Sequence, residues 1–180
     1  MRKRLLVQIR RHQRLGTAAM FDDIDTELQT RLDSLVKALE DRIDAALSSD
    51  DVLAENAGVL RSIPGIGPVA STMLIAEMPE FGTITGEEDA AHTGLAPMAH
   101  ERGTVRGKRA IAGGRRALRH VMLQAVLVAA HHITIMKTFA DRSRKAGKPH
   151  KVIIIAVARK LIILANALTK TRQKWAPSPI

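Results

Sequence analysis

Hydrophobic residues recur at helical spacing over most of the chain and predict a protein built mainly from α-helices. Residues 21–47, FDDIDTELQTRLDSLVKALEDRIDAAL, place Ile24, Leu28, Leu35 and Leu39 on one face, while acids dominate the other. Two arginines interrupt this apolar seam, which runs for fewer than four heptads. The pattern predicts an amphipathic helix that either pairs with another helix, in the manner of a coiled coil, or packs on its own domain.

A polar break follows this helix at SSDD, residues 48–51, where Ser49 or Asp50 can cap a new helix. The break predicts a boundary between two parts of the chain. Residues 1–50 form a basic arm, either a helix or a disordered tail, with the connecting amphipathic helix. Residues 51–176 form a helical domain, and residues 177–180 are a tail.

Within the second part, the pattern predicts helices over 52–61, from Pro68 to about Met78, from Arg115 in two pieces to about 146, and over 150–171. TGEE, residues 85–88, predicts a capping box in which Thr85 and Glu88 satisfy each other's backbone amides. Residues 94–114 have no sustained period and predict a loop. RQKWAPSPI at the end is rich in proline, and we expect it to fray.

The most hydrophobic stretch, VIIIAVARKLIILANAL, carries Arg159 and Lys160 in its middle. Because two charges at the centre of a bilayer would each cost roughly 3 kcal/mol, this stretch predicts a buried helix and not a membrane span. The expected location of the protein is the cytoplasm, in association with the nucleoid.

Composition limits the kinds of partner and active site that this chain can have. The chain has 180 residues and a net charge of +10, which favours a polyanionic partner. It has no Cys and no Tyr, which excludes disulfides, thiolate metal sites and nucleophiles of either type. With three Phe and one Trp, a binder that stacks single-stranded bases on aromatic rings is not expected. Seven histidines occur at no spacing suited to a metal ion, and no metal site is predicted among them.

The segment SIPGIGP, residues 62–68, lies between two predicted helices. Glycines allow a tight hairpin, and Pro68 suits the first position of the following helix. Backbone amides at such a helix start bind phosphate oxygens. With its flanking apolar residues the segment resembles the helix-hairpin-helix motif of DNA-binding proteins, and a plain turn between packed helices is the alternative. The predicted phosphate-binding residues are Gly65, Ile66, Gly67 and Val69.

The densest positive charge lies between His100 and His120, with seven Lys or Arg residues against one acid, Glu101. Glycines in the same stretch allow close approach to a strand, and Arg side chains match phosphate geometry. We expect strongly salt-dependent nucleic-acid binding here, whereas a solvated basic face is the alternative. The predicted contacts are Arg102, Arg106, Lys108, Arg109, Arg115, Arg116 and Arg119.

Several motifs, taken in order, are similar to a known family. LRSIPGIGPVASTMLIAEMPEFGTIT, HTGLAP, RGKRAIAGGRRALRHVMLQAVLVA and FADRSRKAGKPHKVIIIAVARKLIILANAL resemble the C-terminal transposase domain of the one-ten/one-sixteen insertion-sequence family. The resemblance covers roughly residues 52–175. It implies an oligomeric enzyme that recombines DNA under the direction of an element-encoded guide RNA. Such an enzyme uses metal-binding acids in an N-terminal RuvC-like domain and a serine nucleophile in this C-terminal domain.

The chain differs from that pattern in two ways. We expect no RuvC-like domain in this chain, so Mg²⁺ is expected only with that domain and no cofactor is expected in this chain. After GLAP and four residues the family has Ser-Gly, whereas this chain has Arg102-Gly103. Arginine cannot form the covalent phosphoester of a serine nucleophile. Thr104 is the nearest hydroxyl and a weak substitute. We therefore predict no catalytic residue and no strand cleavage by this polypeptide alone.

These observations predict a DNA-binding fragment of an insertion-sequence transposase. Its expected partners are DNA, a guide RNA, and either further copies of itself or a full-length transposase, joined through residues 21–47. The alternative is a non-catalytic regulator that binds element DNA or joins full-length subunits. A free-standing helix-hairpin-helix repair accessory protein is a third reading, and it leaves the downstream motifs unexplained.

Overall fold

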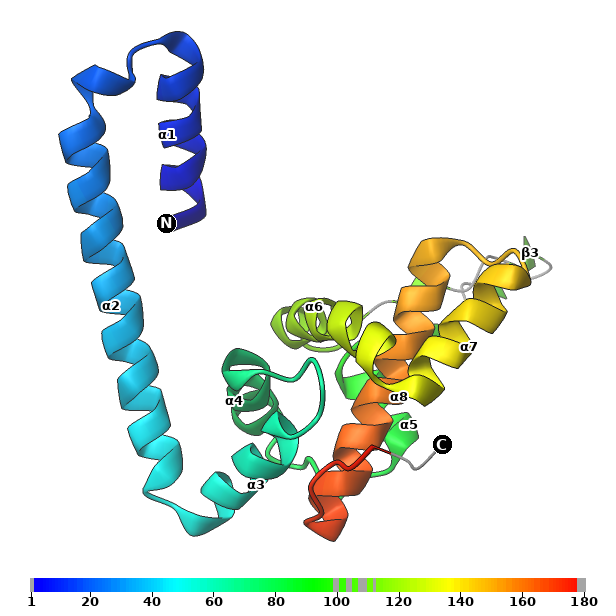
Figure 1. Cartoon of the computed structure of the whole chain (residues 1–180). Helices are drawn as coiled ribbons and strands as arrows, with labels where there is room; N and C mark the ends of the chain where they lie inside the picture. The colour runs from blue at the N-terminus through cyan, green and yellow to red at the C-terminus, as the bar shows by residue number, and fades with distance from the viewer. Residues whose placement is uncertain (1, 99–100, 103–104, 107–109, 112, 178–180) are drawn as a thin grey trace. The chain divides into compact units, whose positions relative to one another are not determined.

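The chain consists mainly of α-helices, as predicted (Figure 1). The computed structural model describes residues 2–98, 101–102, 105–106, 110–111 and 113–177. These fall into two compact units, Met1–Ser49 and Asp50–Ile180. Each unit has its own packing and is described separately below.

The first unit is a pair of helices joined by a short 3₁₀ turn. The basic arm, for which the sequence left a helix or a tail open, is a helix. His12 Nδ1 lies 2.9 Å from Asp25 Oδ2, and the His12 ring stacks on Phe21 at 4.4 Å between centroids. These contacts and buried Leu5 hold the two helices together. The elements are α1 (Arg2–Leu15), η1 (Ala18–Met20) and α2 (Asp22–Ser48).

The apolar face of α2 is mostly exposed to solvent. Leu28 is 45%, Leu35 is 55% and Leu39 is 57% exposed. Within the first unit, α1 leaves these three residues uncovered. That this face pairs with another helix, or packs on its own domain, stays a prediction.

The second unit surrounds one long apolar helix, α8, which packs against α3, α5, α6 and α7. Val157, Leu161 and Ile162 of α8 are fully buried, as predicted for this stretch. By length and composition alone α8 could span a bilayer, but it is a core helix in this unit. The helices of this unit are α3 (Asp51–Arg61), α4 (Pro68–Glu77), α5 (Gly86–His92), α6 (Arg116–His132), α7 (Thr134–Lys145) and α8 (His150–Thr171).

Helix starts follow the predicted capping chemistry. The Asp50 carboxylate accepts hydrogen bonds from the backbone amides of Val52 and Leu53. Thr85 and Glu88 form the predicted capping box, with the Thr85 amide donating to Glu88 Oε2 at 2.8 Å. Each cap satisfies amides that the first helical turn leaves without a partner.

Two predictions for this unit were wrong in part. The segment 94–114 contains short antiparallel pairs in addition to loop, and two-residue strands are too short to produce a readable sequence period. The tail after α8 does not fray over its described residues, because Trp175 packs against the core and its amide donates to Ser62 Oγ at 2.8 Å. The strands are β1 (Pro97–Met98), β2 (Glu101–Arg102), β3 (Val105–Arg106) and β4 (Ala110–Ile111); β1 pairs with β4, and β2 with β3.

Candidate nucleic-acid interface

The segment SIPGIGP forms a tight turn between α3 and α4, as its prolines and glycines predict. Ile63 and Ile66 are buried in the core, and the Ile66 amide donates to the Ile63 carbonyl at 3.0 Å. Ile66 therefore anchors the turn, and its amide is already used within the protein. Of the four residues predicted to bind phosphate, this one serves the fold.

Gly65 lies against α6 and has a backbone conformation that favours glycine, with φ of +97°. A Cβ atom there would collide with the carbonyl oxygen of Ala125 and lie 3.1 Å from the amide nitrogen of Ala129. Only glycine permits this close approach of turn and helix. The packing fixes where α4 begins relative to α6.

The start of α4 is open to solvent. Gly67 occupies the N-cap position with no side-chain cap, and Pro68 is the first helical residue. Val69 is 59% exposed. An uncapped helix start presents amides and the positive end of the helix dipole, which is the arrangement that phosphate oxygens bind.

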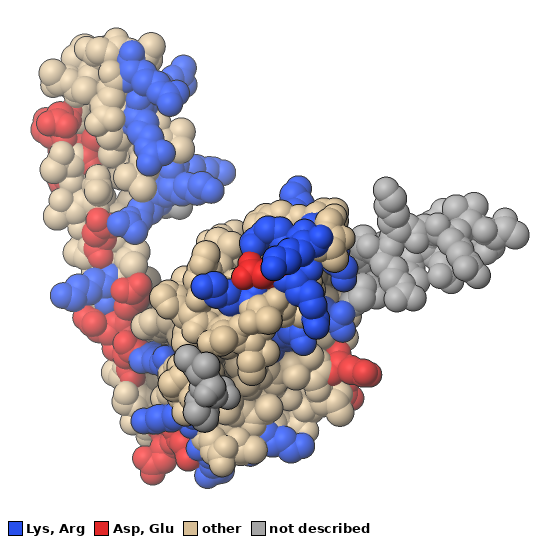
Figure 2. All heavy atoms as spheres, turned by 45° about the vertical axis from the view of Figure 1, so that its right-hand side comes forward, with Lys and Arg blue, Asp and Glu red and all other residues tan. Residues whose placement is uncertain are grey.

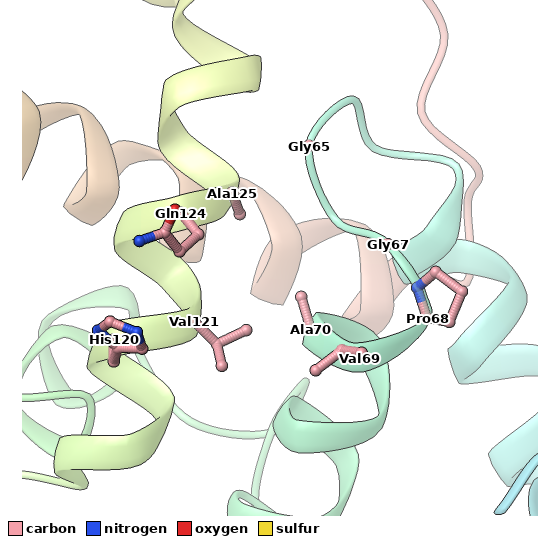
Figure 3. A pocket seen from close by; sticks show the side chains of 9 residues that line it. All are labelled: Gly65, Gly67, Pro68, Val69, Ala70, His120, Val121, Gln124 and Ala125. Carbon is pink, nitrogen blue, oxygen red and sulfur yellow. The ribbon is translucent and has the colours of Figure 1, made fainter. Parts of the chain in front are cut away.

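A shallow groove of about 340 Å³ separates this helix start from α6 (Figure 3). On the α6 side, His120 and Gln124 are exposed at its rim, and Val121 faces it. On the other side, the groove is formed by the turn and the first residues of α4. Its full lining is Gly65, Gly67, Pro68, Val69, Ala70, His120, Val121, Gln124 and Ala125.

Ser71, one of the two hydroxyls in α4, has a packing role. It is fully buried, donates to the Pro68 carbonyl at 2.9 Å and accepts from Arg61 Nε at 3.1 Å. It therefore ties the last residue of α3 to the first turn of α4. This contact stabilises the hairpin and leaves the hydroxyl inaccessible to a nucleic acid.

Two of the predicted basic contacts are engaged within the protein. Arg115 Nη1 lies 3.0 Å from Glu80 Oε1, which also binds His92 Nδ1 at 2.9 Å. Hydrogen bonding to its own backbone and then to Arg115 lowers the pKa of Glu80, so the acid stays ionised. Arg119 Nη1 donates to two carbonyl oxygens at the base of the segment 94–114, those of Gly94 and Gly113.

The base of that segment is closed by a backbone contact. The amide of Arg115 donates to the His92 carbonyl at 2.9 Å, and Gly114 packs directly on the backbone of Gly94. Both glycines have positive φ, so side chains would be strained as well as crowded. Arg115 and Arg119 thus hold the two ends of the segment together.

The other predicted contacts are less constrained. Arg116 is exposed at the start of α6. The structure describes Arg102 and Arg106 as backbone of the β2–β3 pair. Thr104, Lys108 and Arg109 lie outside the described residues. Among the described residues there is no group of three or more His, Asp or Glu suited to a metal ion, and no chemical step through Mg²⁺ is assigned to them.

Sequence reasoning overlooked one buried polar group. Asp89 of α5 is fully buried, and neither carboxylate oxygen makes a well-formed hydrogen bond to the described residues. Burial raises its pKa to about 6, with the charge of His92 as the main opposing influence. The amide of nearby Asn166 is engaged with the Ile84 carbonyl and the Gly82 amide. Asp89 reads in sequence as one more acid in a first helical turn, which gives no sign of its burial.

Comparison with known proteins finds a family with a similar sequence over the segment that carries these features. A model of the transposase IS116/IS110/IS902 family matches residues 57–141, from α3 to α7. An insertion element IS110 protein of Streptomyces coelicolor is 29% identical over 136 residues, covering 74% of this chain and 33% of its own length. The pilin gene-inverting protein of Moraxella bovis is 27% identical over 177 residues, covering 96% of this chain and 55% of its own length.

An insertion element IS900 protein of Mycobacterium paratuberculosis is 29% identical over 157 residues, covering 82% of this chain and 39% of its own length. The chain thus spans between a third and about half of the length of these relatives. The matched segment includes the hairpin, the 94–114 segment and α6, which carry the motifs singled out from the sequence. Over residues 57–141 the chain is therefore similar to the transposase IS116/IS110/IS902 family.

Proposed function

We propose that this chain holds DNA as part of a DNA-recombining transposase system and does not itself cut the strand. Relatives that belong to insertion elements or invert a pilin gene support a role in DNA transposition or recombination. The observation that carries the second half of the proposal is Arg102-Gly103, which stands where the family pattern has Ser-Gly. Its cellular place would be the cytoplasm, at the nucleoid.

The chemistry of cleavage requires a nucleophile that can form and release a phosphoester. A serine hydroxyl does this once it loses its proton, whereas a guanidinium stays protonated and has no free electron pair to attack phosphorus. Arg102 can instead contribute a positive charge and paired N–H groups that suit a phosphate. Thr104 is displaced by two residues from the family position. Binding is therefore compatible with the residues present, and covalent attack is not.

Cleavage is tested directly by a search for protein–DNA adducts. The full chain is incubated with labelled DNA carrying the ends of its element, an element-derived guide RNA and Mg²⁺, and then denatured in detergent. We expect no label to travel with the protein. A covalent adduct would refute the assignment, and loss of that adduct on Thr104→Val would identify the nucleophile.

The proposed DNA contact at the hairpin is the uncapped start of α4. Val69→Glu places a negative charge at the second residue of this helix, where it suits the helix dipole but repels a phosphate. Val52→Glu is a matched control, because Val52 is 52% exposed and is the second residue of α3. We expect Val69→Glu to weaken binding to duplex DNA at least tenfold in fluorescence anisotropy, and Val52→Glu to change it less than twofold.

Both variants should keep or slightly raise the melting temperature, because an acid in the first turn is stabilising by about 0.3–1 kcal/mol. Equal DNA binding by the two variants would place the phosphate contact away from the hairpin. Failure of the unchanged protein to bind DNA at any salt concentration would refute the proposed function as a whole. The two results are distinguishable in one titration series.

The exposed apolar face of α2 favours a second role, as a partner that joins other copies or a longer transposase. Leu39 is 57% exposed in this face, and burying several such residues between two helices would stabilise an assembly. Leu39→Glu should shift the chain toward the monomer in light scattering after size exclusion. Val7→Glu is the control, since Val7 is 60% exposed in α1. A parent chain that is monomeric at high concentration would contradict self-association.

A further inference from the structure

The turn between α7 and α8 carries a cationic surface outside the stretch 100–120 that the sequence singled out. Its residues are exposed, and one acid lies among them, Asp141, whose Oδ1 is 2.6 Å from Arg144 Nη1. In Figure 2, Lys and Arg side chains crowd the second unit at the height of this turn. The α7–α8 cationic surface comprises Lys137, Arg142, Arg144, Lys145, Lys148, Lys151 and Lys160.

Helix stability does not explain this arrangement. Arg142, Arg144 and Lys145 in the last turn of α7 suit the negative end of its dipole. Lys148 and Lys151, in contrast, flank the start of α8, where the dipole is positive. No acid lies in the first turn of α8, and its N-cap residue provides no side-chain cap. Positive charge is therefore concentrated where the fold itself would favour negative charge.

An aromatic ring keeps two of these cations close to each other. Lys160 Nζ lies 4.8 Å from the centroid of the Phe139 ring, and Arg142 Cζ lies 5.8 Å from it. Each cation is attracted by the ring, which offsets part of their mutual repulsion. The ring thus connects the turn to the middle of α8 and extends the charged surface along both helices.

Within the described residues, these cations differ from Arg115 and Arg119, the two engaged arginines at the start of α6. Arg115 is paired with Glu80, and Arg119 donates to backbone carbonyls. On the α7–α8 cationic surface, Arg144 pairs with Asp141, and the described residues show no other ion pair with a cation of this surface. Exposed cations that bind phosphates release counterions from the nucleic acid. They therefore contribute more to nucleic-acid affinity than arginines that are already engaged within the protein.

We infer that the α7–α8 cationic surface binds the phosphate backbone of duplex DNA, as a contact separate from the hairpin. Phe139 is half-buried beneath its two cations, so this surface offers no open aromatic face for the stacking that single-stranded binders use. Cations spread along two helices suit the evenly spaced phosphates of a duplex. This inference rests on the proposed DNA-binding function.

The test uses the full chain and a short duplex DNA, with affinity measured by anisotropy over a range of salt concentrations. The double variant Lys148→Gln, Lys151→Gln removes two charges from the surface. The double variant Lys170→Gln, Lys174→Gln is the matched control, because it removes two exposed lysines at and beyond the other end of α8. Loss of two phosphate contacts should lower the slope of log K against log salt by about 1.8.

A fourfold rise in salt should then weaken the unchanged chain about twelvefold more than it weakens the surface variant. The control variant should follow the unchanged chain. The surface variant should melt at the same temperature or higher, because it removes charges that oppose the dipole of α8. A slope equal to that of the control would overturn the inference, as would a loss seen with duplex RNA and not with duplex DNA. Failure of the unchanged chain to bind DNA would instead refute the proposed function.

Discussion

The buried carboxyl of Asp89 makes the stability of the second unit depend on pH, and Asp89→Asn should remove that dependence. Burial raises the pKa of this group from 3.8 to about 6. The positive charge of His92 opposes the rise, and Glu80 and Glu88 add to it. Because the pKa is higher in the folded state, the folded protein binds the proton more tightly than the unfolded chain.

The sign and size of the effect follow from this difference. The stabilising contribution of protonated Asp89 is complete below about pH 4 and is lost as the pH rises through about 6. At about 1.4 kcal/mol per pKa unit, the shift corresponds to about 3 kcal/mol of unfolding free energy. An asparagine carries no charge but leaves an amide with unmet donors, which costs about 1–2 kcal/mol. The net gain of Asp89→Asn at pH 7.5 should therefore be about 1–2 kcal/mol.

Urea unfolding followed by circular dichroism, from pH 4 to pH 7.5, measures the effect as a difference between parent and variant. Glu87→Gln is the control, because Glu87 is exposed in the same helical turn and the substitution removes the same charge. Glu80 and Glu88 have lowered pKa values, so their protonation below about pH 4.5 destabilises the folded protein. Both residues are present in parent and variant, so their effect cancels in the difference. A flat difference curve, or a less stable variant at pH 7.5, would show that the ionised carboxylate is satisfied in the folded protein.

Two further substitutions test the packing around the hairpin and the core helix. Gly65→Ala should destabilise the second unit by about 3 kcal/mol or more in thermal melts, because the new Cβ collides with the backbone of Ala125 and the residue has a positive φ. Gly67→Ala is the control and should cost less than about 1 kcal/mol, because a Cβ there meets no other atom. Asn166→Ala leaves two backbone groups without their partner and should cost about 2–4 kcal/mol in urea unfolding.

Local chemistry made the helices predictable from sequence. Their apolar periods are long, and their starts use side chains that act within three residues, as Asp50 and the pair Thr85 and Glu88 show. Gly65 was identified in the same way, because a glycine between prolines indicates a tight turn. The partner that makes this glycine necessary, Ala125, lies sixty residues away and carries no pattern that the sequence could reveal.

Features that depend on tertiary contacts could not be predicted. Arg115 and Glu80 are separated by 35 residues. They pair because the start of α6 lies beside the segment after α4, which is a tertiary contact. Trp175 reads as part of a proline-rich tail, yet 113 residues separate it from the Ser62 hydroxyl that holds it. The burial of Asp89 depends in the same way on α8. In each case a polar residue with an ordinary surface pattern acquired a partner or an environment from another part of the chain.

This redistribution of polar partners changes how positive charge in the chain should be interpreted. A count along the sequence treats Arg115 and Arg119 as equal to Lys148 and Lys151, but the first two close the base of the 94–114 segment while the second two face solvent against the dipole of α8. Removing a cation of the first kind should weaken DNA binding only through a displaced segment, with loss of stability. Removing one of the second kind should weaken binding with stability unchanged or raised. Comparison of salt slope with melting temperature therefore separates cations that hold the fold from cations that hold DNA.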